Sequence, residues 1–429
     1  MKRKQFVQRR KALGYTQESL AEELGVDRTT VVRWERGDSE PQPWVRKRLA
    51  AALDVSLDEL DVLISEIVAT TLDNSPPVGV TVAKGTDERG DTTDRRTFAI
   101  SAALTALGVV GPARDVFAST EVPRSIGLEQ VRFAASLVDR LRLADAAAGA
   151  NQLCDLAMGV HQRLSTLATH SSYGREVGEA LQATLADLAN EIGWLTIDAE
   201  RRAESRRYLH EAISRARIVD DPRKEARALA CLALFTREKQ PKESLQCVEA
   251  AQRVSAGWAT PRLRALLHLR AAHAYAHQQD AGAFGREVSK ALTHLDRGTH
   301  DDDLPVLAFV TEREARASQG LAYLALGRPD RAAAMFRANT AAPPTPGHER
   351  NDVGDQVLLA EAVRRQHDAS QAAEIALAAL PSVAALQSRR TAARLAEVRA
   401  GLGRERSRSP RVRAFVEAYD QTTAGWPTT

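Results

Sequence analysis

The sequence predicts an all-α protein in which a small N-terminal domain of five helices is followed by a solenoid of helical hairpins. From about residue 130 to residue 416 the chain is rich in alanine and leucine, and its apolar residues recur at the 3.6-residue spacing of a helix. The alternation of apolar and polar residues that marks a half-buried strand is nearly absent. A length of 429 residues predicts at least two domains.

The composition is that of an ordinary globular protein. Hydrophobic residues make up 44%, charged residues 27%, and the formal net charge is +3, which excludes wholesale disorder and a collagen-like fibre. No apolar run reaches the ~18 residues that a membrane-spanning helix requires, and no apolar segment of a secretory signal follows the basic N-terminus. The three cysteines are too few and too scattered for a disulfide framework or a zinc site: Cys154, Cys231 and Cys247. We therefore expect a cytoplasmic protein without a membrane partner.

Three zones differ in their pattern along the chain. Residues 1–65 are dense in short helical signals, whereas residues 66–125 contain the Pro, Gly, Thr and Asp clusters that are typical of a linker. One apolar helix is expected within this linker, at about residues 95–110. Residues 126–425 form the array of helical hairpins.

The first 37 residues contain three short helical segments. They are Lys4–Leu13, a segment that Thr16 caps and that runs to Leu24, and Arg28–Arg36 behind the capping residue Asp27. A glycine follows each segment: Gly14, Gly25 and Gly37. Two helices joined by a three-residue turn that contains glycine form a helix-turn-helix. Their apolar positions close one small core: Leu20, Ala21, Leu24, Val26, Val31 and Trp34.

The segment Gly14–Gly37, with Pro41 after it, closely resembles the XRE family, whose members include phage Cro and repressor proteins. Thr-Gln, Leu-Ala, Leu-Gly-Val and Trp-Glu-Arg-Gly all fall at the family spacing. Leu49–Val55 and Ser56–Leu60 resemble the closing helices of that family, and Arg10 and Glu35 match positions that pair in it. The resemblance implies a DNA-binding regulator of transcription.

Helix-turn-helix geometry places the N-terminal part of the third helix in the major groove, so its exposed side chains meet base edges. Arginine bonds guanine bidentately, and the methyl groups of threonine and valine suit the thymine methyl. We expect these side chains at the base edges: Arg28, Thr29, Thr30, Val32 and Arg33. Gln17 matches the glutamine with which the family grips the DNA backbone, and Lys11, Arg36 and Arg46–Arg48 are candidate phosphate contacts. Residues 1–11 carry six basic side chains and no acid, although residues 1–60 carry 12 basic and 10 acidic residues.

The segment Gly320–Phe336, with Pro344 after it, resembles a tetratricopeptide (TPR) repeat. Gly320, Tyr323, Ala332, Phe336 and Pro344 fall at the spacing of that family's packed helix pair. Weaker copies place these residues at the position of Gly320: Gly193, Leu232, Ala272 and Ala360. Phe235, Tyr275 and Val363 take the place of Tyr323, and Ala212, Ala251, Ala291 and Ala379 fill the small position of the second helix. Successive units begin 39, 40, 48 and 40 residues apart, and the widest spacing predicts an inserted loop around Gly298–Leu304. Gln130–Leu167 and Pro381–Leu402 are expected to cap the array.

The resemblance implies that the first helix of each pair lines a concave groove. Its inward positions, which we expect to bind a peptide, a small molecule or a protein, are Asn190, Trp194, Asp198, Arg237, His273, His277, Glu361, Arg364 and Arg365. The alternative is that the array only dimerises the protein or spaces its parts. His273 and His277 lie four residues apart, as two metal ligands would, but no third ligand is near, and we expect neither a metal nor a cofactor. No motif for catalysis is present, so an enzyme is not expected.

The linker contains one further signal. Asp94–Phe98 and the apolar residues that follow to Gly111 look like a twin-arginine export signal. This segment lies almost a hundred residues into the chain, behind a DNA-binding module, so an apolar linker helix that docks on the repeats or on a second subunit is the preferred interpretation.

Together, the helix-turn-helix and the helical array predict a sequence-specific regulator of transcription. An isolated helix-turn-helix buries little DNA surface, so we expect a homodimer on a pseudo-palindromic operator. The array would control activity through a ligand, a peptide or a protein. Two other hypotheses are a helix-turn-helix tethered to a scaffold that binds a protein partner without a small ligand, and an uncharacterised enzyme in the C-terminal half.

Overall fold

The structure is a computed structural model of the chain. It describes residues 3–12, 15–36, 39–53, 121–147, 150–343, 349–386, 388–403 and 409–424, with the single positions 55, 60, 64, 117 and 119. Within these residues it contains eighteen α-helices, one short 3-10 helix and no strand, which confirms the all-α fold class. The chain divides into two compact units, Met1–Glu88 and Arg89–Thr429. The expected linker helix at residues 95–110 lies outside the described residues.

The first unit contains four described helices: α1 (Lys4–Ala12), α2 (Gln17–Leu24), α3 (Arg28–Arg36) and α4 (Pro43–Ala52). Thr16 closes a capping box, since its hydroxyl accepts from Ser19 N at 3.0 Å while its own N donates to Ser19 Oγ at 2.8 Å. Gly25 ends α2 in the left-handed conformation, at φ 66°. The sequence thus predicted the bounds of α2 and α3. Of the expected fifth helix, Ser56–Leu60, only Leu60 lies within the described residues.

A single apolar core holds the first unit together. All the core positions expected from the sequence belong to it, with Val26 half-buried at its edge. Phe6 from α1 and residues of and after α4 complete it: Val45, Leu49, Ala50, Leu53, Leu60 and Ile64. The small Ala21, 3% exposed, lies where α2 and α3 pack together, since a larger side chain would separate the two helices.

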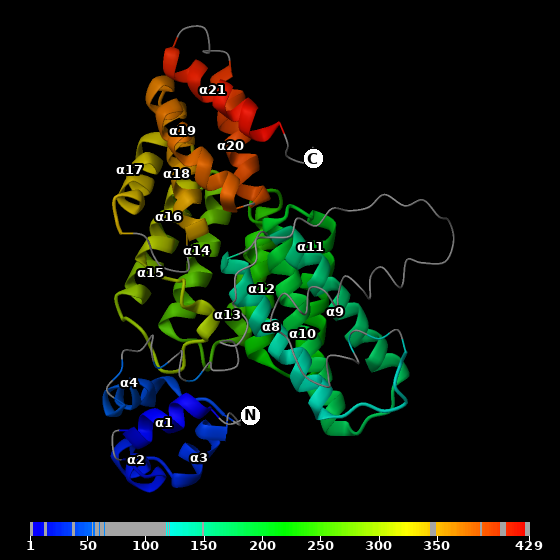
Figure 1. Ribbon diagram of the computed structural model, residues 1–429. Helices are drawn as coiled ribbons and strands as arrows, with labels where there is room; N and C mark the ends of the chain where they lie inside the picture. The colour runs from blue at the N-terminus through cyan, green and yellow to red at the C-terminus, as the bar shows by residue number, and fades with distance from the viewer. Residues whose placement is uncertain are drawn as a thin grey trace, which may run out of the picture. The chain divides into compact units, whose positions relative to one another are not determined.

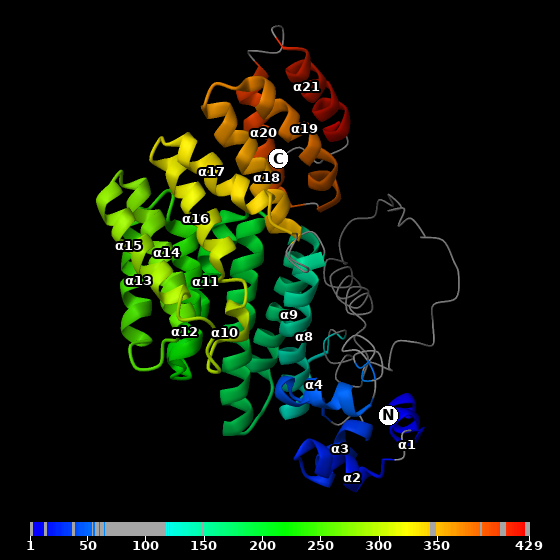
Figure 2. The ribbon, with the colours of Figure 1, turned by 90° about the vertical axis from the view of Figure 1, so that its left-hand side faces the viewer.

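The second unit is a stack of helical hairpins (Figures 1 and 2). Two longer helices precede the stack, and two follow it, α20 (Arg389–Leu402) and α21 (Pro410–Thr423). The preceding pair is α8 (Leu128–Ala147) and α9 (Ala150–His170). The five hairpins are α10 (Arg175–Asp198) with α11 (Arg202–Ile218), α12 (Pro222–Thr236) with α13 (Pro241–Val254), α14 (Pro261–His277) with α15 (Ala281–Leu295), α16 (Glu312–Ala325) with α17 (Pro329–Thr340), and α18 (Glu349–Arg365) with α19 (Ala369–Leu386).

Two glycines mark the close approach of the helices within a hairpin. A Cβ atom on Gly193 would lie 2.5 Å from the side chain of Leu209, and one on Gly320 would lie 2.5 Å from Phe336. Both partners follow their glycine by sixteen residues, so the two hairpins pack in the same register. The alignment of Gly193 with Gly320 therefore describes the packing correctly.

The turns inside the hairpins repeat as well. In four of the five hairpins, the residue seven positions after the one aligned with Gly320 has a positive φ. These residues are Glu200, Gln279, Gly327 and His367. In each, the next residue donates its N–H to a carbonyl five residues earlier, as Arg328 does to Tyr323 at 2.8 Å. This repeated helix ending gives the array one geometry of turn, although only Gly327 has the residue type that favours it.

One part of the repeat alignment is wrong. Ala332 follows Gly320 by twelve residues, whereas Ala212, Ala251, Ala291 and Ala379 follow their aligned positions by nineteen. The residues that occupy the position of Ala332 are Ser205, Ser244, Phe284 and Ala372, all of them buried. Both positions lie on the same face of the second helix because they are seven residues apart, which is close to two helical turns.

The C-terminal end of the array also differs from expectation. Pro381 does not begin a capping segment, because α19 continues through it to Leu386. The capping helix α20 starts at Arg389 and packs on α18, and it also contacts α10 at the far end of the stack. The expected loop around Gly298–Leu304 is confirmed, since it lies between α15 and α16 and is followed by the 3-10 turn Pro305–Leu307.

Helix α19 is long and apolar enough to cross a membrane by length and composition alone, which the sequence analysis did not anticipate. It is an alanine-rich packing helix of the second unit. Its buried residues recur every three or four positions, from Ala369 to Val383, and belong to a core shared with α18, α20 and α21. Gln371 and Glu374 lie on the exposed face.

Candidate nucleic-acid interface and interior cavities

The short helix α3 presents one polar face to solvent. Arg28, Thr29, Arg33 and Arg36 are exposed, and Thr30 and Val32 are half-buried. Val31, Trp34 and Glu35 face the core and are buried. Neither Arg28 nor Arg33 forms a hydrogen bond or an ion pair with another described residue. The structure thus leaves the side chains predicted to meet base edges accessible to a partner.

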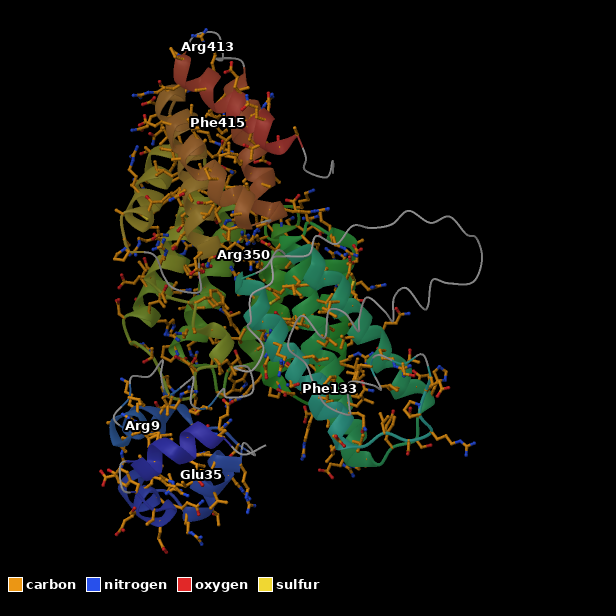
Figure 3. All side chains as sticks on the ribbon, viewed as in Figure 1. Arg9, Glu35, Phe133, Arg350, Arg413 and Phe415 are labelled. Carbon is orange, nitrogen blue, oxygen red and sulfur yellow. The ribbon has the colours of Figure 1, made fainter. Side chains whose placement is uncertain are left out.

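Glu35, labelled in Figure 3, holds α3 in place through contacts of its buried carboxylate. One of its carboxylate oxygens accepts from Arg10 Nε at 2.6 Å, and the other accepts from Gln17 Nε2 at 2.5 Å. Arg10 and Glu35 are 5% and 6% exposed, so this is a buried ion pair that joins α1, α2 and α3. The expected pairing of Arg10 with Glu35 is confirmed. Gln17, predicted to grip the DNA backbone, uses one amide hydrogen for Glu35 and keeps a second.

The basic residues of the first unit divide into two groups. Arg3 is buried and donates to the carbonyl oxygens of Trp34 and Ser39, each at 3.0 Å, and Arg10 is held by Glu35. Arg48 donates to the carbonyl of Glu23 at 2.8 Å. These three residues therefore stabilise the fold, whereas the exposed Lys11, Arg28, Arg33, Arg36 and Lys47 carry the accessible positive charge.

The second unit contains two neighbouring, partly open cavities of about 690 and 650 Å³. The first helix of each hairpin lines them, together with α20 and the inserted loop at residues 304–309. Asn190, Trp194 and Arg237 line the larger cavity, and the smaller one is lined by five of the predicted groove residues: Arg237, His273, His277, Glu361 and Arg365. Cavities of this volume accommodate small organic molecules.

Two of the predicted groove residues do not line either cavity. Asp198 is 3% exposed and is bound by Arg350 and Arg390, each at 3.2 Å, and by the hydroxyl of Ser388. Arg364 packs over Gly401 and donates to Glu361 at 2.8 Å. Asp198 lies at the end of α10, and Arg364 lies against α20. The repeat register did not include either contact. Their predicted role in a groove is therefore not supported by their positions.

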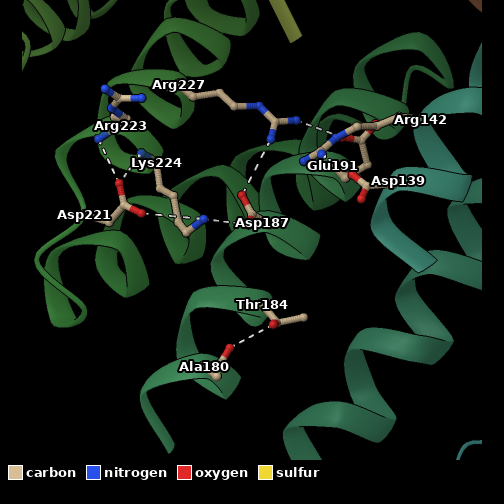
Figure 4. A network of polar contacts seen from close by, with 10 residues as sticks. All are labelled: Asp139, Arg142, Ala180, Thr184, Asp187, Glu191, Asp221, Arg223, Lys224 and Arg227. Atoms are coloured by element: carbon tan, nitrogen blue, oxygen red, sulfur yellow. Dashed lines mark hydrogen bonds and ion pairs between the residues drawn. The ribbon is translucent and has the colours of Figure 1, made fainter. Parts of the chain in front are cut away.

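A network of charges joins α8, α10 and α12 along the larger cavity (Figure 4). Glu191 accepts from Arg142 at 3.1 Å and from Arg227 at 2.9 Å, and Asp187 pairs with Lys224 at 2.7 Å. In the amide orientation that satisfies both groups, Asn190 also accepts from Arg227. The network orients Arg227 and ties α8, α10 and α12 to one another.

Six of the seven arginines that line the larger cavity were not predicted from the sequence: Arg142, Arg227, Arg270, Arg350, Arg390 and Arg394. Arg270 lies one helical turn before His273, so the helical period of α14 was a signal for it. Arg390 and Arg394 lie four residues apart on α20, a helix that we assigned to a capping role. Arg227 lies one helical turn before Cys231, which also lines the larger cavity.

Burial lowers the pKa values of the basic side chains in the cavity walls. It lowers the pKa of Arg237, Arg270 and Arg394, and their mutual repulsion with Arg390 lowers it further. Burial and the same arginines hold the pKa of His273 well below its usual value, so this imidazole is neutral at pH 7. No group of three metal-ligating side chains occurs within the part of the chain that the structure describes.

Comparison with known protein families supports the assignment of the N-terminal fold. A search of the whole chain against curated proteins found no match. Residues 7–60 match the model of the helix-turn-helix family, and this segment contains α2, α3 and the Glu35 contacts. The N-terminal unit is thus an XRE-type helix-turn-helix, which indicates DNA-binding regulation of transcription.

Proposed function

We propose that this protein is a sequence-specific regulator of transcription in which α3 reads base pairs in the major groove. The observation that carries the proposal is the exposed polar face of α3, held from behind by the buried pair of Arg10 and Glu35. Arg28 and Arg33 are positioned to bond guanine edges, and Thr29, Thr30 and Val32 to contact thymine methyl groups. Lys11 and Arg36 would contact phosphates.

Gln17 takes a supporting part in this proposal. It lies at the first turn of α2, where free backbone N–H groups favour a phosphate, and its amide keeps one hydrogen beyond the bond to Glu35. A phosphate held there would connect DNA to Glu35, and through Glu35 to α3. Gln17 would thus fix the depth of α3 in the groove without reading sequence.

The second unit would sense a signal and dimerise the protein. The support is that the first helices of five hairpins surround cavities with charged walls. A ligand that binds one curvature of the array better than another would change the spacing of two DNA-binding heads on a pseudo-palindrome with half-sites about 34 Å apart. A coupling of about 1–3 kcal/mol is sufficient for a useful change in operator affinity.

Selection from random oligonucleotides tests the proposal. The full chain, at moderate ionic strength, should enrich a pseudo-palindromic site, and light scattering should give the mass of a dimer on that site. A selection that enriches no sequence would refute sequence-specific binding. Enrichment of a single half-site by a monomer would refute the dimer alone.

A further inference from the structure

Two buried arginine side chains and a half-buried third one line the larger cavity with fewer hydrogen-bond acceptors than their donors need. Arg237, at the end of α12, is 6% exposed, and Arg270, on α14, is 4% exposed. Their Nε atoms, like that of Arg390 on α20, find no hydrogen-bond partner among the described residues. Three helices, α12, α14 and α20, therefore each place a guanidinium group with an unpartnered Nε at the cavity walls, and Arg390 also pairs with Asp198 at 3.2 Å.

The carboxylates nearby do not balance this charge. The larger cavity is lined by seven arginines and four carboxylates. Glu191 is shared by Arg142 and Arg227, and Asp198, behind the wall, is shared by Arg350 and Arg390. Among the described residues, the carboxylate that pairs with Arg237 is that of the exposed Glu238, at 3.8 Å. Arg237, Arg390 and Arg394 line both cavities, so the excess positive charge is greatest where the cavities adjoin.

His273 adds a neutral donor to the same place. It is 1% exposed, lines the smaller cavity beside Arg237, and both of its ring nitrogens find no partner within the described part of the chain. A neutral imidazole carries one N–H, which suits an oxygen atom of an anion. Burial of unpaired guanidinium and imidazole groups costs free energy, and a bound anion would recover it.

The larger cavity also has an apolar part. Side chains from five helices and the inserted loop supply this apolar part: Trp194, Leu234, Leu266, Phe309, Leu321 and Leu358. The cavity volume, about 690 Å³, exceeds what an inorganic ion needs. A molecule that fits both surfaces has an anionic group at one end and an apolar body at the other.

We propose that the interior of the second unit binds a small organic anion, with its carboxylate or phosphate held by Arg237, Arg270 and Arg390 and its apolar body against Trp194 and Leu266. Two or more guanidinium groups bind such anions through paired N–H donors. The proposal names the ligand class for the sensing role given above, and its effect on DNA binding rests on that role. Binding of the anion in the cavity does not depend on that role.

The test uses the full chain and a fluorescent anion with an apolar body, 8-anilinonaphthalene-1-sulfonate. We expect saturable binding that octanoate or octyl phosphate displaces and that octanol, of the same length without charge, does not. Arg237→Met and Arg270→Met should each weaken binding of the probe at least tenfold. Both should also raise the melting temperature of the unliganded protein, because each removes an unsatisfied buried charge. Arg253→Met, on the exposed face of α13, is the matched control and should change neither quantity.

The outcomes separate this proposal from the proposed function. Displacement by octanol as effective as by octanoate, or equal probe binding by the wild type and both variants, would overturn the anion site. The melting temperature shows that a variant which loses the probe is still folded. If a variant no longer binds the probe while its unliganded form binds DNA as the wild type does, the result supports the anion site. A wild type that binds the probe but selects no DNA retains the anion site and contradicts only the regulator.

Discussion

Asp198, the last residue of α10, pairs with Arg350 in α18 at 3.2 Å although the two residues are 152 positions apart in the sequence. Arg390 and Ser388, at the start of α20, bind the same carboxylate. The curvature of the hairpin stack thus brings its first hairpin against its last, and one buried carboxylate joins the two ends. We call these residues the Asp198 junction.

The substitution Asp198→Asn should weaken the second unit by about 3–5 kcal/mol, because it leaves the buried ends of Arg350 and Arg390 without their counter-charge. Urea denaturation followed by circular dichroism measures the loss. Asp420→Asn removes the partly exposed partner of Arg399 and should cost under about 1 kcal/mol. Equal losses in the two variants would mean that the Asp198 junction does not hold the array together.

Gly320→Ala should destabilise the array by about 1–3 kcal/mol, since the new Cβ would lie 2.5 Å from Phe336. Helix propensity alone would favour alanine by roughly 1 kcal/mol. Gly285→Ala, in α15, is the control because a Cβ there meets no atom within 4 Å, and it should stabilise the protein. Thermal denaturation distinguishes them, and a stabilising Gly320→Ala would contradict the register of this hairpin.

Asp355 should contribute a stabilisation of the second unit that falls as the pH rises from 4 to 7. Burial raises the pKa of this carboxyl from 3.8 to about 6, against the opposing effects of Asn339 and Arg313. The folded state holds the proton more tightly, so the stabilisation is complete below pH 4 and lost as the pH passes 6. The full contribution is about 3 kcal/mol.

Asp355→Asn isolates this effect, since asparagine accepts from Asn339 Nδ2 as the aspartate does at 2.9 Å. Urea titrations at several pH values should show that the variant is the more stable protein at pH 8, and that the difference from the wild type shrinks towards pH 4. A difference that does not change with pH would show that Asp355 ionises normally.

Glu35→Gln should destabilise the first unit by about 3–5 kcal/mol, because the buried guanidinium of Arg10 loses its counter-charge. Hydrogen exchange of the amides in α1 to α4 measures the change in this unit alone. Glu40→Gln is the control: Glu40 is exposed, lies 3.7 Å from Arg3, and should contribute under about 1 kcal/mol. Unchanged exchange in Glu35→Gln would show that α3 is held by apolar packing only.

The helix bounds and the core of the first unit could be predicted where the residues that determine them lie close together in the sequence. Thr16, Gly25 and the apolar positions of α2 and α3 act within a few residues of one another, so their pattern fixes the helix bounds. The sixteen-residue spacing of Gly320 and Phe336 similarly fixes one hairpin.

Contacts set by the curvature of the array were not predictable in this way. Asp198 had the spacing of a groove residue, yet it meets Arg350 and Ser388 through the accumulated rotation of five hairpins, which no local pattern encodes. Arg390 and Arg394 enter the cavity walls for the same reason.

The central claim is that α3 reads sequence, and titrations of Arg33→Ala and Lys11→Ala test it most directly. Both proteins and the wild type are titrated, at one salt concentration, onto the selected operator and a scrambled duplex of equal length. We predict that Arg33→Ala lowers the preference for the operator by about 1–3 kcal/mol, whereas Lys11→Ala weakens binding to both duplexes alike. Equal losses on both duplexes for both variants would contradict the account.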